Sequence, residues 1–223
     1  MSAVQAAIEP TPSVAHTVNV VAKASLVGLL VLAVLYPESG NMRDKAAGLR
    51  AVGYPLMSFT VPVLWWVWWR ERSAYPWLAD VLVTMTCFTD VLGNRLDLYD
   101  TVVWFDDWMH FMNTGLLAAA VLLLTMPRAA GLGRLVERAL AFGATAAIAW
   151  ELAEYFAFIS GSVERRFAYT DTLGDLALGT LGAVVAAVVV HRAWRRADLA
   201  DAGVVVRDVS PGVVTTARDE TPA

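Results

Sequence analysis

Six apolar runs separated by short polar segments dominate the sequence. They cover Val18–Tyr36, Leu49–Trp69, Trp77–Leu92, Asp106–Met126, Val136–Ser160 and Asp171–Trp194. Most are close to the ~20 residues that a helix needs to cross a hydrocarbon core about 30 Å thick. Strict period-two alternation is missing, and in lipid every backbone polar group must be satisfied internally. The pattern therefore predicts an all-α fold, a polytopic transmembrane helical bundle of about six spans.

The segments between the runs predict where the spans end. "YPESGNMRDKAAG" is rich in turn formers, and "WWVWWRERSAYPW" places tryptophans before charge, which is typical of an interfacial aromatic belt. The third run is the shortest and most polar, because Thr84, Thr86, Thr89 and Asp90 interrupt it. We expect a flexible N-terminal segment over residues 1–17, a membrane domain over 18–196 and a disordered polar tail over 197–223.

Composition points to the same class of protein. The chain is 57% hydrophobic and 17% charged, whereas about 25% of the residues of a soluble domain are charged. The net charge of −4 provides no basic patch for nucleic acid. Cys87 is the only cysteine, so an intramolecular disulfide and a thiolate metal site are excluded. The N-terminus lacks the basic region of a secretion signal, and we expect the first run to be a retained span.

Lysine and arginine residues near the span ends predict the orientation of the chain in the membrane. Eight arginines lie on the side of the N-terminus, and six basic residues lie on the other side. Because basic residues are in excess on the cytoplasmic side of membrane proteins, this distribution favours a cytoplasmic N-terminus and a cytoplasmic C-terminus.

Acidic residues and a histidine occur in pairs at helical spacing within three of the runs. Residues three or four positions apart share one helix face, and intramembrane charge that faces lipid is costly. Each pair is therefore expected to point into the bundle. The pairs are Asp106 with His110, Asp107 with His110, Glu151 with Glu154, and Asp171 with Asp175.

If consecutive spans alternate in direction, all of these pairs lie toward the same membrane face. Six carboxylates and one imidazole cannot all be charged and close together without compensation. A divalent metal is the simplest compensation, because carboxylates and histidines on facing helices are a known metal-binding arrangement. Oxygen ligands suit Mg²⁺, Mn²⁺ or Ca²⁺, whereas the imidazole also admits Zn²⁺ or Fe²⁺. The expected metal ligands are Asp106, His110, Glu151, Glu154, Asp171 and Asp175.

Some of these residues also have a purely structural interpretation. Asp106 and Asp171 begin their runs and would serve as helix N-caps, and Asp107 is then a solvated charge of the first turn. Asp90 and Asn94, spaced i,i+4 at the end of the third run, are expected with Asp107 to orient ligands rather than bind metal. The candidates for catalysis are His110, Glu151 and Glu154.

Three motifs carry a family resemblance. "FDDWMHF", "WELAEYF" and "TDTLGDLALGTLGA" resemble, in this order, elements of the YjdF family of uncharacterised bacterial inner-membrane proteins, over Asp106 to Ala183. The resemblance implies a multi-pass protein of the inner membrane and supplies no reaction. VanZ-like membrane proteins are more distantly similar, but tend to have glutamine and asparagine where this chain has Glu154 and Asp175.

Three functions remain open on the sequence. The first is a metal-dependent membrane enzyme acting on a lipid-linked or envelope substrate, since a metal near an interface lies where a lipid head group lies. The second is an ion, proton or solute transporter, for which intramembrane acids are also expected. The third is a structural or regulatory membrane protein whose bundle is stabilised by a cation. A shared site requires Glu151, Asp175 and the ring of His110 to lie within about 8 Å, because metal–ligand bonds are only ~2.0–2.6 Å.

Overall fold

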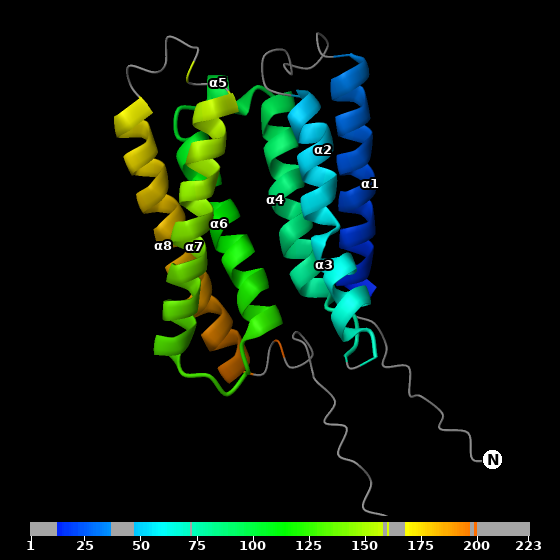
Figure 1. Cartoon of the computed structure of the whole chain (residues 1–223), viewed down its shortest axis with the longest axis vertical. Coiled ribbons are helices and arrows are strands. Elements are labelled where there is room, and N and C mark those ends of the chain that lie inside the picture. Colours follow the sequence, from blue (N-terminus) through cyan, green and yellow to red (C-terminus); the bar gives the residue numbers. More distant parts are fainter. Residues whose placement is uncertain are drawn as a thin grey trace, which may run out of the picture.

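The chain folds into long helices that lie side by side. The computed structural model describes residues 13–36, 47–71, 73–157, 160, 168–196 and 199, and over these ranges it contains helices and no strand (Figure 1). This confirms the all-α bundle. Residues 1–12 and the expected C-terminal tail, apart from Leu199, lie outside the described ranges, whereas residues 13–17 form the first turns of α1. The long single helices are α1 (Ser13–Leu35), α4 (Trp77–Arg95), α6 (Phe105–Thr125), α7 (Leu132–Ala157) and α8 (Ala168–Arg195).

The second apolar run is broken rather than continuous. It forms α2 (Ala47–Ser58), the short α3 (Thr60–Leu64) and a π-helical turn, η2 (Trp65–Trp69). Pro62 accounts for the break between α2 and α3, because proline has no N–H to donate to the carbonyl four residues earlier, that of Ser58. The prediction of one uninterrupted helix over Leu49–Trp69 therefore missed the effect of this proline.

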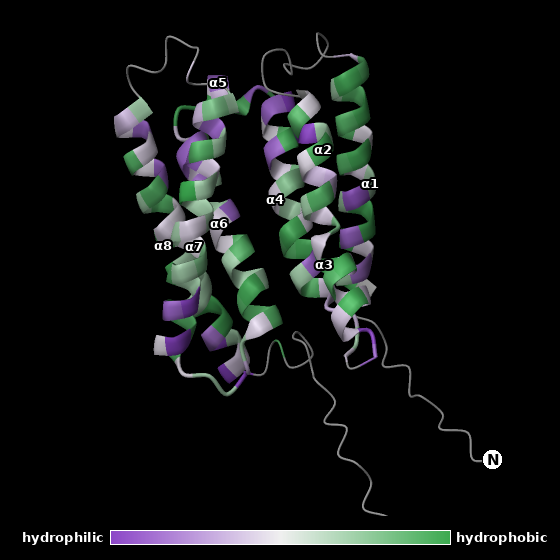
Figure 2. Ribbon diagram, viewed as in Figure 1, coloured by the Kyte–Doolittle hydropathy of each residue, from purple (hydrophilic) through white to green (hydrophobic). Residues whose placement is uncertain are grey.

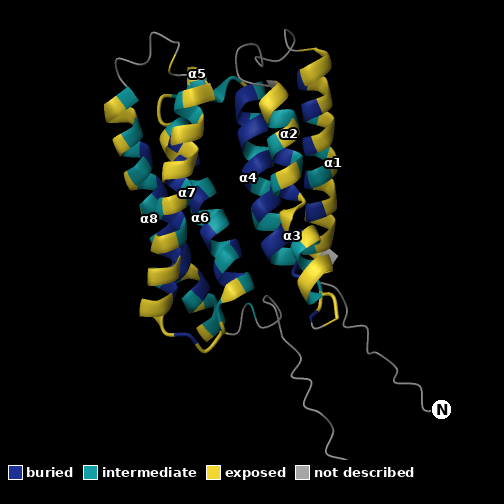
Figure 3. Ribbon diagram, in the orientation of Figure 1, coloured by how far each residue is buried: buried dark blue, intermediate teal, exposed yellow. Residues whose placement is uncertain are grey.

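Four helical segments among the described residues are long and apolar enough to cross a membrane. They are Val14–Leu35, Gly48–Trp69, Phe105–Thr125 and Ala168–Arg195. The outer faces of the bundle are largely hydrophobic (Figure 2), as a lipid-facing surface requires. Helices α4 and α7 have comparable lengths but carry more polar residues. Helix α4 is buried along most of its length (Figure 3), and its buried residues include Asp80, Thr84, Asp90 and Asn94.

The helices form two groups that meet mainly between α4 and α6. In the first group, α1 and α2 pack on α4, around a core that includes Leu26, Tyr54 and Cys87. In the second, α8 packs against both α6 and α7, and α6–α8 is the most extensive helix pair of the molecule. Where the groups meet, the ring of Phe105 packs directly on Gly93.

The end of the bundle nearest the short helix α5 (Leu98–Thr101) gathers the predicted polar pairs. Helix α6 begins there, α7 ends there and α8 begins there (Figure 1). The first turns of α6 and α8 and the last turns of α7 are therefore neighbours. This is the arrangement that alternating span directions predicted.

Candidate metal centre

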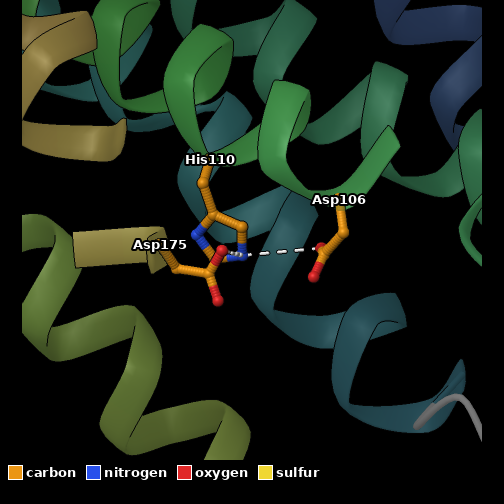
Figure 4. Close-up of side chains that lie close together, drawn as sticks. All are labelled: Asp106, His110 and Asp175. Carbon is orange, nitrogen blue, oxygen red and sulfur yellow. Dashed lines mark ion pairs between the residues drawn. The ribbon is translucent and has the colours of Figure 1, made fainter. Parts of the chain in front are cut away.

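His110 lies between carboxylates from three helices. Its side chain, in the second turn of α6, is 9% exposed. Its Nε2 is 3.5 Å from Oδ1 of Asp106 and 3.7 Å from Oδ1 of Asp175 on α8, and its Nδ1 is 3.5 Å from Oε1 of Glu151 on α7. In Figure 4, Asp175 approaches the ring from the left and Asp106 from the right. The convergence expected for His110, Glu151 and Asp175 is present.

Small residues allow this convergence. A β-carbon on Gly115 of α6 would lie 3.0 Å from the carbonyl oxygen of Gly182 of α8, so the two backbones cross at close range. Asp175 lies seven residues before Gly182, two turns along the same face of α8. The crossing therefore sets the distance between the carboxylate of Asp175 and the ring of His110, one to two turns from the point of closest approach.

Glu151 has one carboxylate oxygen without a hydrogen-bond donor. The residue is 8% exposed, and its Oε2 accepts a hydrogen bond of 3.0 Å from the hydroxyl of Thr172 on α8. Its Oε1 is buried, has no hydrogen-bond partner and faces His110. Buried polar atoms are nearly always satisfied, so an exception of this kind points to a proton or cation that completes the group.

The residues around His110 fall into two possible ligand sets. In each set, one ligand atom per residue lies within 4.8 Å of the others. One set is Asp106, His110 and Asp175, and the other is His110, Glu151 and Glu154. A neutral imidazole has one free lone pair, so His110 can bind a metal in one set only. The nitrogen that does not bind metal then carries a proton, which it typically donates to a carboxylate.

The set on the Nε2 side has two separations from His110 that suit a shared ion. Ligand atoms bound at about 2.0–2.2 Å to a tetrahedral ion are roughly 3.3–3.6 Å apart. The separations of 3.5 and 3.7 Å from Nε2 to the oxygens of Asp106 and Asp175 are close to this range. Nδ1 then faces Glu151, the acceptor that a metal-binding histidine requires.

Asp107 and Asp171 lie apart from these two sets. Both are exposed, in the first turns of α6 and α8 respectively. Neither belongs to either ligand set among the described residues. Asp171 lies one turn before Asp175, where its negative charge complements the dipole of the α8 N-terminus. The metal-binding role expected for Asp171 and the orienting role expected for Asp107 stay predictions.

Asp90 belongs to a separate polar network between α4, α2 and α5. Its carboxylate accepts hydrogen bonds from Nε of Arg50 at 3.0 Å, from the hydroxyl of Tyr54 and from the hydroxyl of Tyr99 at 2.9 Å. The side-chain amide of Asn94 donates to the backbone carbonyl of Asp90. Burial and the nearby charge of Asp90 raise the pKa of Tyr99 well above its ordinary value, so its phenol stays a donor.

The predicted role of Asp90 and Asn94 as groups that orient metal ligands is therefore not supported by a direct contact. Within the described part of the chain, their hydrogen bonds run to α2, α5 and their own helix rather than to His110. Helix α4 also packs directly against α6. Thr89 of α4, whose hydroxyl lies 3.3 Å from Oδ1 of Asn113, makes that contact.

A third buried network, which the sequence reasoning did not identify, joins α1 to α4. The ammonium group of Lys23 is 2.7 Å from Oδ1 of Asp80, and Asp80 is 1% exposed. The available signal was the presence of Lys23 and Asp80 inside apolar runs, because ionisable residues within a span are functional candidates by default.

The fold and the buried polar networks define a polytopic helical membrane protein. The chain belongs to the family described as predicted membrane protein (DUF2238), whose sequence pattern matches residues 19–196. This assignment confirms the resemblance to the YjdF-like membrane proteins. Comparison with curated proteins and with solved structures gives no match. The bacterial inner membrane and the cytoplasmic position of both termini remain predictions.

Proposed function

We propose that the protein binds a divalent cation between Asp106, Nε2 of His110 and Asp175, and uses it in a reaction on a membrane-embedded substrate. One observation carries the proposal. Around His110 the chain gathers carboxylates from α6, α7 and α8, and among the described residues no lysine or arginine pairs with them.

The two other buried aspartates of the bundle show how this chain otherwise compensates such charge. Asp80 is paired with Lys23 and Asp90 with Arg50, each across a helix interface. Burying a charge without a partner is strongly unfavourable. The ring of His110 supplies at most one positive charge for Asp106, Glu151, Glu154 and Asp175. A divalent ion at Nε2 would bind a neutral imidazole and balance two of these four carboxylates.

In this arrangement Glu151 and Glu154 have different roles. Oε1 of Glu151 lies 3.5 Å from Nδ1 of His110, and Thr172 fixes its other oxygen. With a metal at Nε2, Glu151 would be the group that accepts the Nδ1 proton and orients the ring. Glu154 is only partly buried and lies one turn nearer the end of the bundle. It is the candidate general base, because a base has to reach both the substrate and a route for the proton.

The donor set narrows the choice of metal. Two carboxylate oxygens and one imidazole nitrogen are typical of Zn²⁺, Fe²⁺ and Mn²⁺, whereas Mg²⁺ and Ca²⁺ are usually bound by oxygen alone. A bound ion of this kind polarises a phosphoryl or carbonyl oxygen or activates a water molecule.

Exposed aromatic side chains support a substrate at the level of the lipid head groups. Trp104 and Trp108 lie at the start of α6, Phe156 lies at the end of α7 and Tyr169 lies at the start of α8, and all four are exposed. Aromatic residues of this kind gather at membrane–water interfaces. The site at the same helix ends is therefore suited to a lipid head group or a lipid-linked envelope intermediate.

Metal binding is tested first, on the full chain purified in detergent and stripped with a chelator. Titration calorimetry with Zn²⁺ and Mn²⁺ should give one ion per chain for the wild type. His110→Ala and Asp175→Asn should each weaken binding at least about tenfold. Asp107→Asn is the matched control, since it removes an exposed carboxylate from the same turn of α6 as Asp106. Equal binding by His110→Ala and Asp107→Asn would contradict the proposal.

The reaction is tested separately. Membranes of a bacterial host that produces the wild type or Asp175→Asn are compared by mass spectrometry of lipids and lipid-linked intermediates. A head-group species that changes with the wild type alone supports an enzyme. If metal binds but both profiles are identical, the enzymatic part of the proposal fails. Metal and proton flux in proteoliposomes then separates a transporter from a bundle that is only stabilised by its cation.

A further inference from the structure

The ammonium group of Lys23 lies in a cage of oxygen atoms. Its Nζ is 2.6 Å from the hydroxyl of Thr84, 2.7 Å from Oδ1 of Asp80, 2.8 Å from the backbone carbonyl of Ser58 and 3.3 Å from Oδ1 of Asn19. These oxygens come from α1, α2 and α4 and combine a carboxylate, an amide, a hydroxyl and a backbone carbonyl. An ammonium group has only three protons to donate, so four oxygens surround it as they would surround a spherical cation.

The backbone carbonyl in this cage is available because of the break after α2. In an uninterrupted helix the carbonyl of Ser58 would accept the N–H of residue 62. Pro62 has no N–H, so this carbonyl is left without a helical partner. Lys23 of α1 takes the vacant position at 2.8 Å. The proline therefore creates an acceptor that faces the cage.

The cage is held together by hydrogen bonds that do not involve Lys23. Oδ2 of Asp80 accepts from the side-chain amide of Asn19 and, at 2.6 Å, from the hydroxyl of Tyr75. The hydroxyl of Thr84 lies 3.0 Å from Oδ1 of Asn19 and 2.8 Å from the backbone carbonyl of Asp80, and it can donate its proton to either oxygen. The positions of these oxygens are thus set by their neighbours, as in a preorganised ion site.

We propose that these oxygens form a monovalent-cation site, and that the resident cation is the chain's own Lys23 ammonium group. Asn19, Ser58, Asp80 and Thr84 supply the ligand atoms. When the lysine side chain is removed, the cage will take a free monovalent cation of similar size, such as K⁺ or methylammonium.

The charge of the cage selects the class of cation. Asp80 is its only carboxylate, and the other three ligands are neutral, so one positive charge balances it. A divalent ion would leave an uncompensated charge in a site where Asp80 is 1% exposed. The ring of Phe59, with its centroid 5.4 Å from Nζ, adds a further group that favours a cation.

The proposal is independent of the metal proposed at His110. The cage lies in the first helix group, and its ligands come only from α1, α2 and α4. It follows that this group needs no cation from solution. Failure of one proposal leaves the other untouched, because the two sites share no residue.

The test is the thermal unfolding midpoint of full-length Lys23→Ala in detergent, measured in chloride salts of K⁺, methylammonium and choline at equal ionic strength. We expect the midpoint to fall by roughly 10 °C in choline, because Asp80 loses its partner. K⁺ and methylammonium should raise it again in a saturable manner, and choline, which is too large for the cage, should not. Lys23→Met is the matched control, since its side chain fills the space without charge and should not respond.

Three results with Lys23→Ala would overturn the proposal. An equal response to choline would show general screening, and no response to any salt would show that the cage does not accept a free cation. A Lys23→Ala protein that stays unfolded in methylammonium would show the same. Lys23→Ala/Asp80→Asn removes both charges, so it should fold and give one midpoint in all three salts. A cation response in this double variant would show that the carboxylate is not the anchor.

Discussion

Gly182 of α8 lies against the backbone carbonyl of Phe111 of α6, so closely that a β-carbon on Gly182 would overlap the carbonyl oxygen. Backbone atoms cannot move aside as a side chain can. The residue next to Phe111 is His110, and two turns before Gly182 is Asp175. The close approach of α6 and α8 therefore helps to set the geometry of the candidate metal centre.

A methyl group at Gly182 should force α6 and α8 apart. Gly182→Ala is expected to lower the free energy of unfolding by about 1–3 kcal/mol, the usual cost of overpacking, and to weaken metal binding at His110. Gly174→Ala is the control on the same helix, because nothing lies within 4 Å of the added β-carbon. Its thermal midpoint should be unchanged or slightly raised, since alanine is the better helix former. Equal stability of the two variants would contradict the packing argument.

Thr172 should tune the affinity of the site without being a ligand. Its hydroxyl donates to Oε2 of Glu151, which faces His110 through Oε1. Thr172→Val keeps the shape and removes the hydroxyl, and we expect metal affinity to fall by about tenfold with the stoichiometry unchanged. Thr172→Ser keeps a hydroxyl and should restore most of the affinity. If the valine and serine variants bind zinc equally well in calorimetry, the hydroxyl has no such role.

Metal affinity should depend on pH with a defined sign. A proton and a metal compete for Nε2 of His110, and carboxylate ligands must also be ionised. Affinity should therefore fall as pH decreases, and metal binding should release protons. Calorimetry in buffers of different ionisation enthalpy measures that release directly. The residual binding of His110→Ala should release fewer protons, and an identical release in both proteins would remove His110 from the ligand set.

The pair of Arg50 and Asp90 should show strong coupling in a double-mutant cycle. Arg50→Met leaves the buried carboxylate of Asp90 without its cation, which should cost about 3–5 kcal/mol of stability. In Arg50→Met/Asp90→Asn the buried charge is gone, and one of the hydroxyls of Tyr54 and Tyr99, which bond to different carboxylate oxygens, can still donate to the amide oxygen while the other accepts from the amide NH2. The double variant should therefore be more stable than Arg50→Met. Additive losses in denaturant unfolding would argue against the ion pair as the main interaction.

Helix positions followed from hydropathy because the membrane allows few alternatives for the backbone. The prediction for the third span, Trp77–Leu92, begins where α4 begins and ends three residues early. The exception is the second span, where the apolar composition hid the effect of Pro62. Hydropathy reports whether a segment prefers lipid, and it does not report whether each carbonyl along it finds a donor.

Helical spacing also predicted that His110, Glu151 and Asp175 would converge, because the geometry of each pair is local and the direction of successive spans alternates. The rotation of a helix about its own axis, by contrast, depends on the helices packed around it. Thr89 contacts Asn113 of α6, whereas the carboxylate of its neighbour Asp90 bonds to Arg50 of α2. This rotation depends on how α4 packs between its neighbours, which spacing within one helix cannot give.

Contacts between segments far apart in the chain also depend on helix packing, so the sequence alone does not predict them. Lys23 and Asp80 are 57 residues apart, and each alone resembles an isolated polar residue in an apolar run. Only the packing of α1 against α4 makes them partners. A charge of opposite sign at a similar depth in another apolar run was the available hint, and such a charge has several possible matches in this sequence.

The division of the bundle into two groups has a consequence for the order in which the protein is made. Each group is contiguous along the chain, with α1 to α4 synthesised before α6 to α8. The ion pairs Lys23–Asp80 and Arg50–Asp90 both lie within the first group, so these helices can assemble in the membrane while the ribosome is still producing the rest. The later helices bring an excess of carboxylates. If the metal proposed at His110 binds, their assembly is the step at which the supply of metal in the cell can influence how much finished protein accumulates.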